Sequence, residues 1–187
     1  MSVMAAANTG GDEREGVPLT NIDDPLFEGA NATKRDLVDY LDGVADRLLP
    51  VLHDRALSVI RVHRGQEAFM QKNLPKYAPE WIERVTSWAE SSKREVTYAL
   101  CNDRRTLVWF ANQRAVEYHP ALTTVAAPER VSHLVLDLGP PDAHSCAVAV
   151  QVAHRVHASL LRACPRGPRP TRGPKGGALR LPAMRRA

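Results

Sequence analysis

The stretch His133-Leu-Val-Leu-Asp137-Leu-Gly139-Pro-Pro141 has the pattern of a buried strand that ends at a sharp turn. Apolar, partly branched residues lead to a carboxylate at Asp137, and the Gly-Pro-Pro sequence then prevents the strand from continuing. A carboxylate held at the end of a strand is a candidate metal ligand at a sheet edge. An acidic residue before a turn can equally serve only to cap that turn. The stretch alone leaves both interpretations open.

The charge of the chain is concentrated at its C-terminal end. The 187 residues carry a net charge of +4 and are long enough for one domain with a sizeable core. Seven of the 25 Lys and Arg residues lie in 165–187, a segment without acidic residues, which leaves 18 basic against 21 acidic residues elsewhere. The basic balance therefore comes from the tail and gives little support for nucleic-acid binding by the folded body.

The cysteines and the N-terminal residues indicate the compartment. The three cysteines are odd in number and have no metal-binding spacing, which is typical of free thiols in a reducing cytosol. No apolar run is long enough for a signal peptide or a membrane span. We expect a cytoplasmic protein with a disordered leader over 1–16, one domain over 17–164, and a basic tail rich in Gly and Pro over 165–187.

Helical and strand patterns mix along the predicted domain, which indicates an α+β fold. The expected elements are a helix that begins at the N-cap Thr33 and is ended or kinked by Pro50, a strand over 56–63, a helical turn over 79–82, strands over 84–89 and 95–101, a buried helix from Thr106 that becomes extended at Val116, and, after the strand at 133–137, a helix over 143–163.

Four residues have side chains that suit DNA. Phe69 and Lys72 could stack on a base and contact a phosphate, although a single Phe is more typical of a core. Arg61 on a strand and Lys34 in the first turn of a helix could each meet a phosphate. Spacing alone gives none of them a role.

Other polar clusters are better explained without a ligand. His154 and His157 lie three apart on the last helix, but they lack a third metal ligand and are more typical of a solvated surface. Paired acids at Asp23 and Asp24, before a proline, favour a turn. The segment 171–177 has the glycine and lysine content of a phosphate-binding loop, yet it follows no recognisable strand.

Six motifs, taken together and in order, resemble the polymerase domain of bacterial DNA ligase D, a member of the archaeo-eukaryotic primase superfamily. The motifs are Leu19-Thr-Asn21, Thr33-Lys-Arg-Asp36, Phe69-Met-Gln-Lys72, Trp109-Phe-Ala-Asn-Gln113, Val116-Glu-Tyr-His119 and Leu134-Val-Leu-Asp-Leu138. The similarity covers roughly residues 17 to 164. It implies mixed sheets with flanking helices, and a nucleotidyltransferase that serves non-homologous end joining.

The resemblance also implies ligands and partners. Such domains bind 5′-phosphorylated DNA ends, add nucleotides from nucleoside triphosphates with Mn²⁺ or Mg²⁺, and work with Ku and a DNA ligase. Carried over by position, the 5′-phosphate pocket would include Asn21 and Lys34, the DNA contacts Phe69 and Lys72, the triphosphate site Arg61, His119 and Lys175, and the catalytic metal site Asp137.

Three departures from the family pattern bear on activity. The Asp-x-Asp-Pro pattern is replaced by Asp137-Leu-Gly139-Pro, so the second carboxylate is missing. A pocket lysine falls at Asp24, and the loop Thr171-Arg-Gly-Pro-Lys175-Gly-Gly-Ala178 keeps Thr171, Gly173, Lys175 and Gly176 but loses two serines and a histidine of the family. A third metal aspartate would lie on a later strand that the sequence does not contain, so we expect the C-terminal catalytic half to be truncated.

Three functions remain open at this point. The chain could be a polymerase or primase domain with impaired catalysis, because two hard cations usually need several carboxylates. It could be a non-catalytic module that binds 5′-phosphorylated DNA ends. It could also be a decayed fragment, whose basic tail would bind DNA only through charge.

Overall fold

The computed structural model describes residues 12–63, 65–90, 93–139, 146–163, 171–172 and 178–182. The chain divides into two compact units, with the boundary between Ala121 and Leu122. The first unit holds β1 (Glu13–Arg14), β2 (Val17–Pro18), α1 (Lys34–Gly43), α2 (Ala45–Leu52), β3 (Ala56–Arg61), β4 (Phe69–Gln71), β5 (Arg84–Ala89), β6 (Arg94–Leu100), α3 (Arg104–Asn112) and β7 (Ala115–Pro120).

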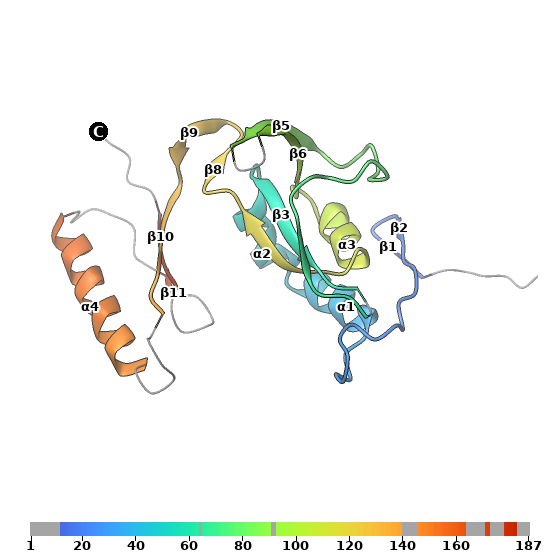
Figure 1. Ribbon diagram of the computed structural model, residues 1–187, viewed down its shortest axis with the longest axis horizontal. Helices are drawn as coiled ribbons and strands as arrows, with labels where there is room; N and C mark the ends of the chain where they lie inside the picture. The colour runs from blue at the N-terminus through green and yellow to red at the C-terminus, as the bar shows by residue number, and fades with distance from the viewer. Residues whose placement is uncertain are drawn as a thin grey trace, which may run out of the picture. The chain divides into compact units, whose positions relative to one another are not determined.

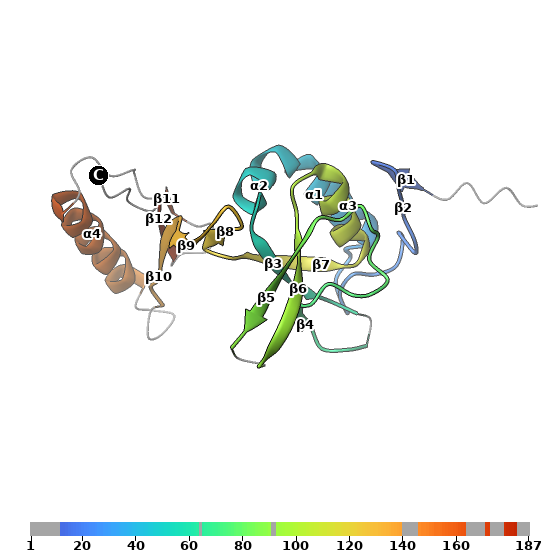
Figure 2. The same ribbon diagram turned by 90° about the horizontal axis from the view of Figure 1, so that it is seen from above.

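An antiparallel five-stranded sheet forms the centre of the first unit. β3 pairs with β7 along one edge. Along its other edge, β3 pairs with β6 at Ala56 and Leu57 and with β4 from Val59 to Arg61, and β5 pairs with β6. The three helices cover one face of this sheet (Figure 2). The core between them includes Leu57 and Val59 of β3 and the almost entirely buried helix α3, with Phe110 among the largest buried side chains. We therefore expect the opposite face to carry the polar and exposed side chains.

The α+β prediction is confirmed, and several element boundaries move. The N-cap at Thr33 is confirmed: its hydroxyl accepts a hydrogen bond from the Asp36 N–H at 3.3 Å, and the Asp36 carboxylate accepts one from the Thr33 N–H at 2.7 Å. The expected break at Pro50 is wrong, because the helix is interrupted at Val44 and Pro50 lies inside α2. Gly43 weakens the helix there, whereas Pro50 costs α2 one backbone bond and lies two residues before its end at Leu52.

Two other expectations on local structure also change. The segment 79–82 is a turn closed by one bond from the Ile82 N–H to the Pro79 carbonyl, not a helical turn. Within the expected leader, β1 pairs with β2 through a two-residue turn at Glu15 and Gly16, both of which have positive φ. Such a turn matches the right-handed twist of a hairpin, so ordered structure begins before Val17.

The second unit, Leu122–Ala187, contains the stretch that begins at His133 and the whole of the expected tail. It comprises β8 (Thr123–Thr124), β9 (Ala127–Val131), β10 (His133–Asp137), α4 (Cys146–Ala163), β11 (Thr171–Arg172) and β12 (Ala178–Pro182). β12 pairs antiparallel with β10, so that Ala178 lies opposite Asp137. Within the predicted basic tail of 165–187, residues 171–172 and 178–182 form strands.

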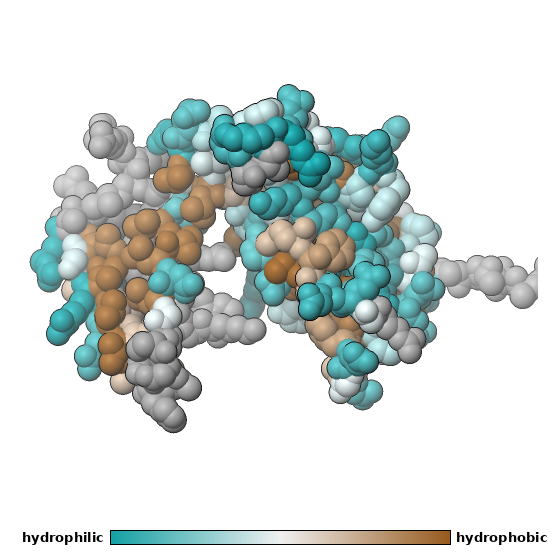
Figure 3. All heavy atoms as spheres, in the orientation of Figure 1, coloured by the Kyte–Doolittle hydropathy of each residue, from teal (hydrophilic) through white to brown (hydrophobic). Residues whose placement is uncertain are grey.

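Hydrophobic side chains are exposed on the second unit. Figure 3 shows them over the region of α4 and β10. The exposed large hydrophobic residues of this unit are Leu122, Val125, Val131, Leu134, Val135, Val148, Val152 and Leu161. Along α4 one side is half-buried and consists of Ala149, Val150, Ala153, Val156 and Leu160, whereas Cys146 is exposed. His154 is exposed as expected, but His157 is half-buried. None of the helices in the described part of the chain is long and apolar enough to cross a membrane.

Candidate nucleic-acid interface

Lys34 is a buried cation at the start of α1. Its side chain is 3% exposed, and its ammonium group donates hydrogen bonds to the Thr20 carbonyl and, at 3.3 Å, to the Thr20 hydroxyl. The backbone N–H of Lys34 donates to the Asp24 carbonyl at 2.9 Å. The turn at 20–24 thus folds back onto the N-terminus of α1, where free N–H groups and the helix dipole favour anions.

Arg114 adds a second cation to this site, and nothing in the sequence spacing indicated it. It follows α3 with a φ of 60°, which turns the chain from the helix into β7. Its guanidinium donates to the Asp24 carboxylate at 3.0 Å and to the Pro25 carbonyl at 3.0 Å. The carboxylate of Asp24 therefore neutralises part of the positive charge of Arg114 and Lys34.

The pKa of Lys34 reflects the burial of its ammonium group and the charges around it. Burial, and then the nearby Arg114, lower the pKa of Lys34 from its ordinary value of 10.5 to about 8, against the opposite effect of Asp24. Arg61 also lowers it, so Lys34, Arg114 and Arg61 lie within electrostatic range of one another. A bound phosphate would relieve this repulsion and hold Lys34 in its charged form.

Asn21 lies in the turn that carries Thr20 and Asp24 to Lys34. It has a φ of 47°, and its carbonyl accepts a bond from the Asp24 N–H at 3.2 Å. Asparagine tolerates this left-handed conformation better than most residues. Asn21 is exposed, so its side-chain amide is accessible to a ligand beside Lys34.

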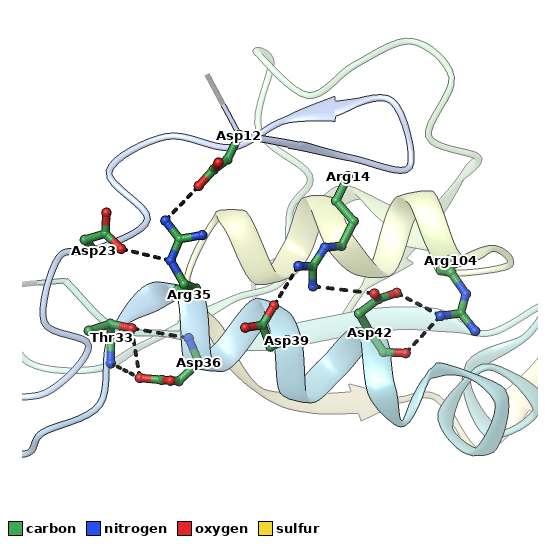
Figure 4. Close-up of polar contacts among 9 residues, drawn as sticks. All are labelled: Asp12, Arg14, Asp23, Thr33, Arg35, Asp36, Asp39, Asp42 and Arg104. Carbon is green, nitrogen blue, oxygen red and sulfur yellow. Dashed lines mark hydrogen bonds and ion pairs between the residues drawn. The ribbon is translucent and has the colours of Figure 1, made fainter. Parts of the chain in front are cut away.

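Ion pairs hold this turn and the N-terminal hairpin against α1 (Figure 4). Arg35 joins Asp12 at 2.7 Å and Asp23 at 2.9 Å, so one guanidinium bridges the two segments. The hydrogen bonds that Arg35 donates to Asp23 and Asp12 raise the pKa of its guanidinium further. Further along α1, Asp39 pairs with Arg14 of β1 at 2.7 Å, and this ion pair holds the hairpin against the helix. The turn that carries Thr20 and Asn21 is thus held from both sides.

Phe69 lies on the surface rather than in the core. It begins β4, opposite Arg61 of β3, and is 39% exposed. Its ring stacks on His63 with the centroids 5.5 Å apart and an angle of 6° between the planes. Lys72 follows the same strand and is exposed. The interpretation of Phe69 as a core residue is therefore wrong, because an edge strand turns this ring toward solvent.

Arg61 is almost fully engaged by the protein. It donates from Nε to the Gln113 carbonyl at 2.7 Å, from one terminal nitrogen to the Gln71 amide oxygen at 2.7 Å and the Tyr77 hydroxyl at 3.0 Å, and from the other to the Gln113 side chain at 3.2 Å. These contacts use four of the roughly five N–H donors of a guanidinium. A role of Arg61 at a triphosphate stays a prediction, and the observed contacts favour a positioning role.

The remaining predicted site residues lie elsewhere. His119 of β7 is opposite Ser58 and is paired with Glu117 at 3.3 Å between Nε2 and the carboxylate. Asp137 ends the strand β10 in the second unit and is exposed. The prediction that this strand is buried is wrong, because Leu134 and Val135 are 46% and 39% exposed. Lys175 lies outside the described residues. The structure thus brings Lys34 and Arg61 together with Arg114, and leaves His119 and Asp137 as separate candidates.

The residues around Asp137 do not fit a two-metal site. Within the described ranges, no group of three or more His, Cys, Asp or Glu residues is placed to hold a metal ion. The position two residues after Asp137 is Gly139, which offers no oxygen ligand from a side chain. Hard divalent cations take several oxygen ligands, and two of them need several carboxylates. The described residues around Asp137 therefore do not supply the ligands of a two-metal site.

Comparison with known proteins identifies the family. The family model described as LigD, primase-polymerase domain, matches residues 33–184. The chain belongs to the LigD primase-polymerase family. This match includes the residues of β11 and β12.

Individual relatives agree with the family model. The chain is 37% identical over 140 residues to the bifunctional non-homologous end joining protein LigD of Bacillus subtilis (strain 168), covering 74% of the chain and 22% of that protein. It is 30% identical over 161 residues to the multifunctional LigD of Mycolicibacterium smegmatis (strain ATCC 700084 / mc(2)155), covering 84% of the chain and 21% of that protein. The chain thus spans about a fifth of these curated relatives.

A solved structure shows the same fold. The polymerase domain of Mycobacterium tuberculosis ligase D, determined in complex with DNA, superposes with a TM-score of 0.78 at 32% identity, covering 90% of this chain and 62% of that one. The LigD-type domain therefore has the primase-polymerase architecture expected from its motifs.

Proposed function

We propose that this LigD-type domain binds DNA ends that carry a 5′-phosphate, as part of non-homologous end joining. The observation that carries the proposal is the buried group formed by Lys34 and Arg114, with Thr20 and Asn21 beside it. Two cations that repel one another and share a single carboxylate, Asp24, make a site that a phosphate dianion would stabilise. The DNA in the complex of the M. tuberculosis relative supports the same class of ligand.

The proposed chemistry of the domain is nucleotide addition, at a low rate or not at all for this chain alone. By family, the substrates would be nucleoside triphosphates, the cofactor Mn²⁺ or Mg²⁺, and the partners Ku and a DNA ligase. The single carboxylate at Asp137, with Gly139 two residues later, supports impaired catalysis. DNA-end binding depends on residues of the first unit and does not require Asp137.

The test is fluorescence anisotropy with one short duplex, prepared with either a 5′-phosphate or a 5′-hydroxyl. We expect a preference for the phosphate on the order of 10-fold, the magnitude of one charge-assisted hydrogen bond. Lys34→Met should remove this preference. Lys93→Met removes a lysine whose side chain is 75% exposed in the β5–β6 turn, and it should leave the preference unchanged.

Salt separates this proposal from binding through the basic tail. Counterion release makes all contacts with DNA phosphates weaker as salt rises, whatever the end of the duplex carries. The ratio of the two dissociation constants should therefore persist over a salt series in which both affinities fall. Equal affinities for the two duplexes throughout the series would reject the phosphate pocket and leave only charge attraction.

A further inference from the structure

Asn112 is the last residue of α3, and its side-chain amide is buried in the first unit. The residue is 8% exposed and follows Phe110 and Ala111, which are 2% and 0% exposed. The chain turns sharply after it, because the Arg114 N–H donates to the Ala111 carbonyl at 2.8 Å. The core and this turn therefore hold the amide of Asn112 in one place.

Both hydrogen-bonding groups of this amide are taken by the segment that precedes α1. The amide oxygen accepts from the Thr20 N–H at 3.1 Å, and the amide nitrogen donates to the Pro18 carbonyl at 3.2 Å. A buried amide costs free energy unless both of its groups are paired, and here both partners lie on one short stretch of chain, 92 residues from Asn112 in the case of Thr20. The amide thus clamps residues 18–20 to the end of α3.

The clamped segment in turn holds the ammonium group of Lys34. Thr20 provides both acceptors, its backbone carbonyl and, at 3.3 Å, its hydroxyl. Two ammonium donors are therefore directed at Thr20, and the remaining donor would face a ligand. A lysine side chain has many rotamers, so the place of its charge depends on the acceptors that fix it. For Lys34, that place is set by the position of Thr20.

Arg114 attaches the other end of the same segment to the end of α3. Its guanidinium bonds to the Asp24 carboxylate and to the Pro25 carbonyl, both at 3.0 Å. Residues 18–25, which include Asn21, are therefore held at one end by Asn112 and at the other by Arg114. The end of α3 supports the pocket from beneath, although Asn112 has no group left over to offer a ligand.

We propose that Asn112 is a positioning residue of the phosphate pocket, which acts through Thr20 to place the ammonium group of Lys34 for a 5′-phosphate. The inference rests on the proposed binding of 5′-phosphorylated ends. It adds a residue that does not touch the DNA and yet determines how well the pocket distinguishes a phosphate from a hydroxyl.

A double-mutant cycle tests this role, by fluorescence anisotropy with the full chain and the two duplexes that differ only at the 5′ end. Asn112→Ala should weaken binding of the phosphorylated duplex on the order of 5-fold, the scale of one net hydrogen bond, and leave the 5′-hydroxyl duplex unchanged. In the Lys34→Met background the same substitution should change neither affinity, because the group that Asn112 positions is gone. Asn112→Gln keeps both groups of the amide and should retain most of the phosphate preference.

Asn102→Ala is the matched control. Asn102 lies just before α3, and its amide also makes two bonds, from the Asp54 N–H at 2.7 Å and to the Glu83 carboxylate at 2.9 Å. Urea unfolding should show a loss of stability in both Asn102→Ala and Asn112→Ala. Only Asn112→Ala should lower the phosphate preference, since Asn102 holds none of residues 18–25.

Three results would overturn the positioning role and leave Asn112 as a structural residue. They are equal weakening of both duplexes by Asn112→Ala, weakening by the same factor in the Lys34→Met background, and a loss in Asn112→Gln as large as in Asn112→Ala. Failure of the proposed function gives a different result, the absence of a phosphate preference in the wild type.

Discussion

The carboxylate of Asp24 lies 3.0 Å from the guanidinium of Arg114, although 90 residues separate them in the sequence. This pair joins the turn before α1 to the turn after α3, and it lies beside the buried ammonium group of Lys34. In the family pattern described above, a lysine is expected where this chain has Asp24. The carboxylate of Asp24 thus partly neutralises the same two cations that would bind a DNA phosphate.

Asp24→Asn should therefore strengthen binding of a 5′-phosphorylated duplex several-fold. The amide can still accept a bond from Arg114, but it no longer competes for the positive charge of Lys34 and Arg114. Binding is measured at pH 7.0, because Asp24 raises the pKa of Lys34 and its loss brings that pKa closer to neutrality. Asp46→Asn, at a side chain 89% exposed, controls for the change in net charge. An equal gain for the 5′-hydroxyl duplex would contradict a local effect at the pocket.

The pKa of Lys34 predicts how stability changes with pH. Between pH 7.5 and 9 the unfolded chain keeps this lysine protonated, since its ordinary pKa is 10.5, whereas the folded chain releases the proton near a pKa of about 8. Rising pH then favours the folded state, by about 1 kcal/mol over that interval. Urea unfolding of the wild type and of Lys34→Met at both pH values measures the difference.

The effect of Lys34 is measured as a difference between two proteins because a second group, Cys101, also makes stability depend on pH. Burial raises the pKa of the Cys101 thiol to about 12 from an ordinary value of 9.0. The unfolded chain therefore loses this proton first, and stability falls as pH rises above about 9. The contribution is common to the wild type and Lys34→Met and cancels between them. A pH dependence that is the same in both proteins would contradict the assignment to Lys34.

Residue patterns predicted most of the first unit because its elements follow local rules. The capping box at Thr33 and the apolar run of α3 depend on neighbours in the sequence, and both appear close to where they were expected. β12 escaped prediction because its five residues lie within a segment dominated by Gly, Pro and Arg. Its pairing with β10 is a long-range interaction, which no local pattern specifies.

The candidate site was harder to predict than the fold. The motif resemblance indicated Lys34 and Phe69, but Arg114 and Tyr77 carry no motif and join the site only through turns that close in three dimensions. Burial also changes chemistry in a way that residue type does not record, as the lowered pKa of Lys34 shows. The sequence thus identified several of the side chains, and the structure supplied their partners.

Tyr118→Phe should stabilise the first unit. The Tyr118 hydroxyl is buried and, among the residues that the structure describes, has no hydrogen-bond partner. The Tyr118 ring packs edge-to-face against the Phe110 ring, with the centroids 6.3 Å apart, and a phenylalanine in place of Tyr118 keeps this contact. Removing an unsatisfied hydroxyl should raise the free energy of unfolding by about 1 kcal/mol. Urea unfolding measures this, with Tyr40→Phe on the surface as the control, and a loss of stability would indicate a partner such as a buried water.

Gly139→Asp tests whether the missing carboxylate limits metal binding beside Asp137. A Cβ at Gly139 would meet nothing within 4 Å, and its φ is not in the positive range, so the chain accepts a side chain there without strain. A second carboxylate two residues after Asp137 adds an anionic ligand of the kind that Mn²⁺ prefers. We expect Mn²⁺ affinity, measured by electron paramagnetic resonance of the free ion, to rise at least several-fold. Primer extension should rise with it if the carboxylate is what limits nucleotide transfer.

The double variant with Asp137→Asn separates a paired site from an added surface charge, because affinity should then return to the wild-type level. Tighter binding that persists without Asp137 would show that Gly139→Asp attracts the ion through charge alone.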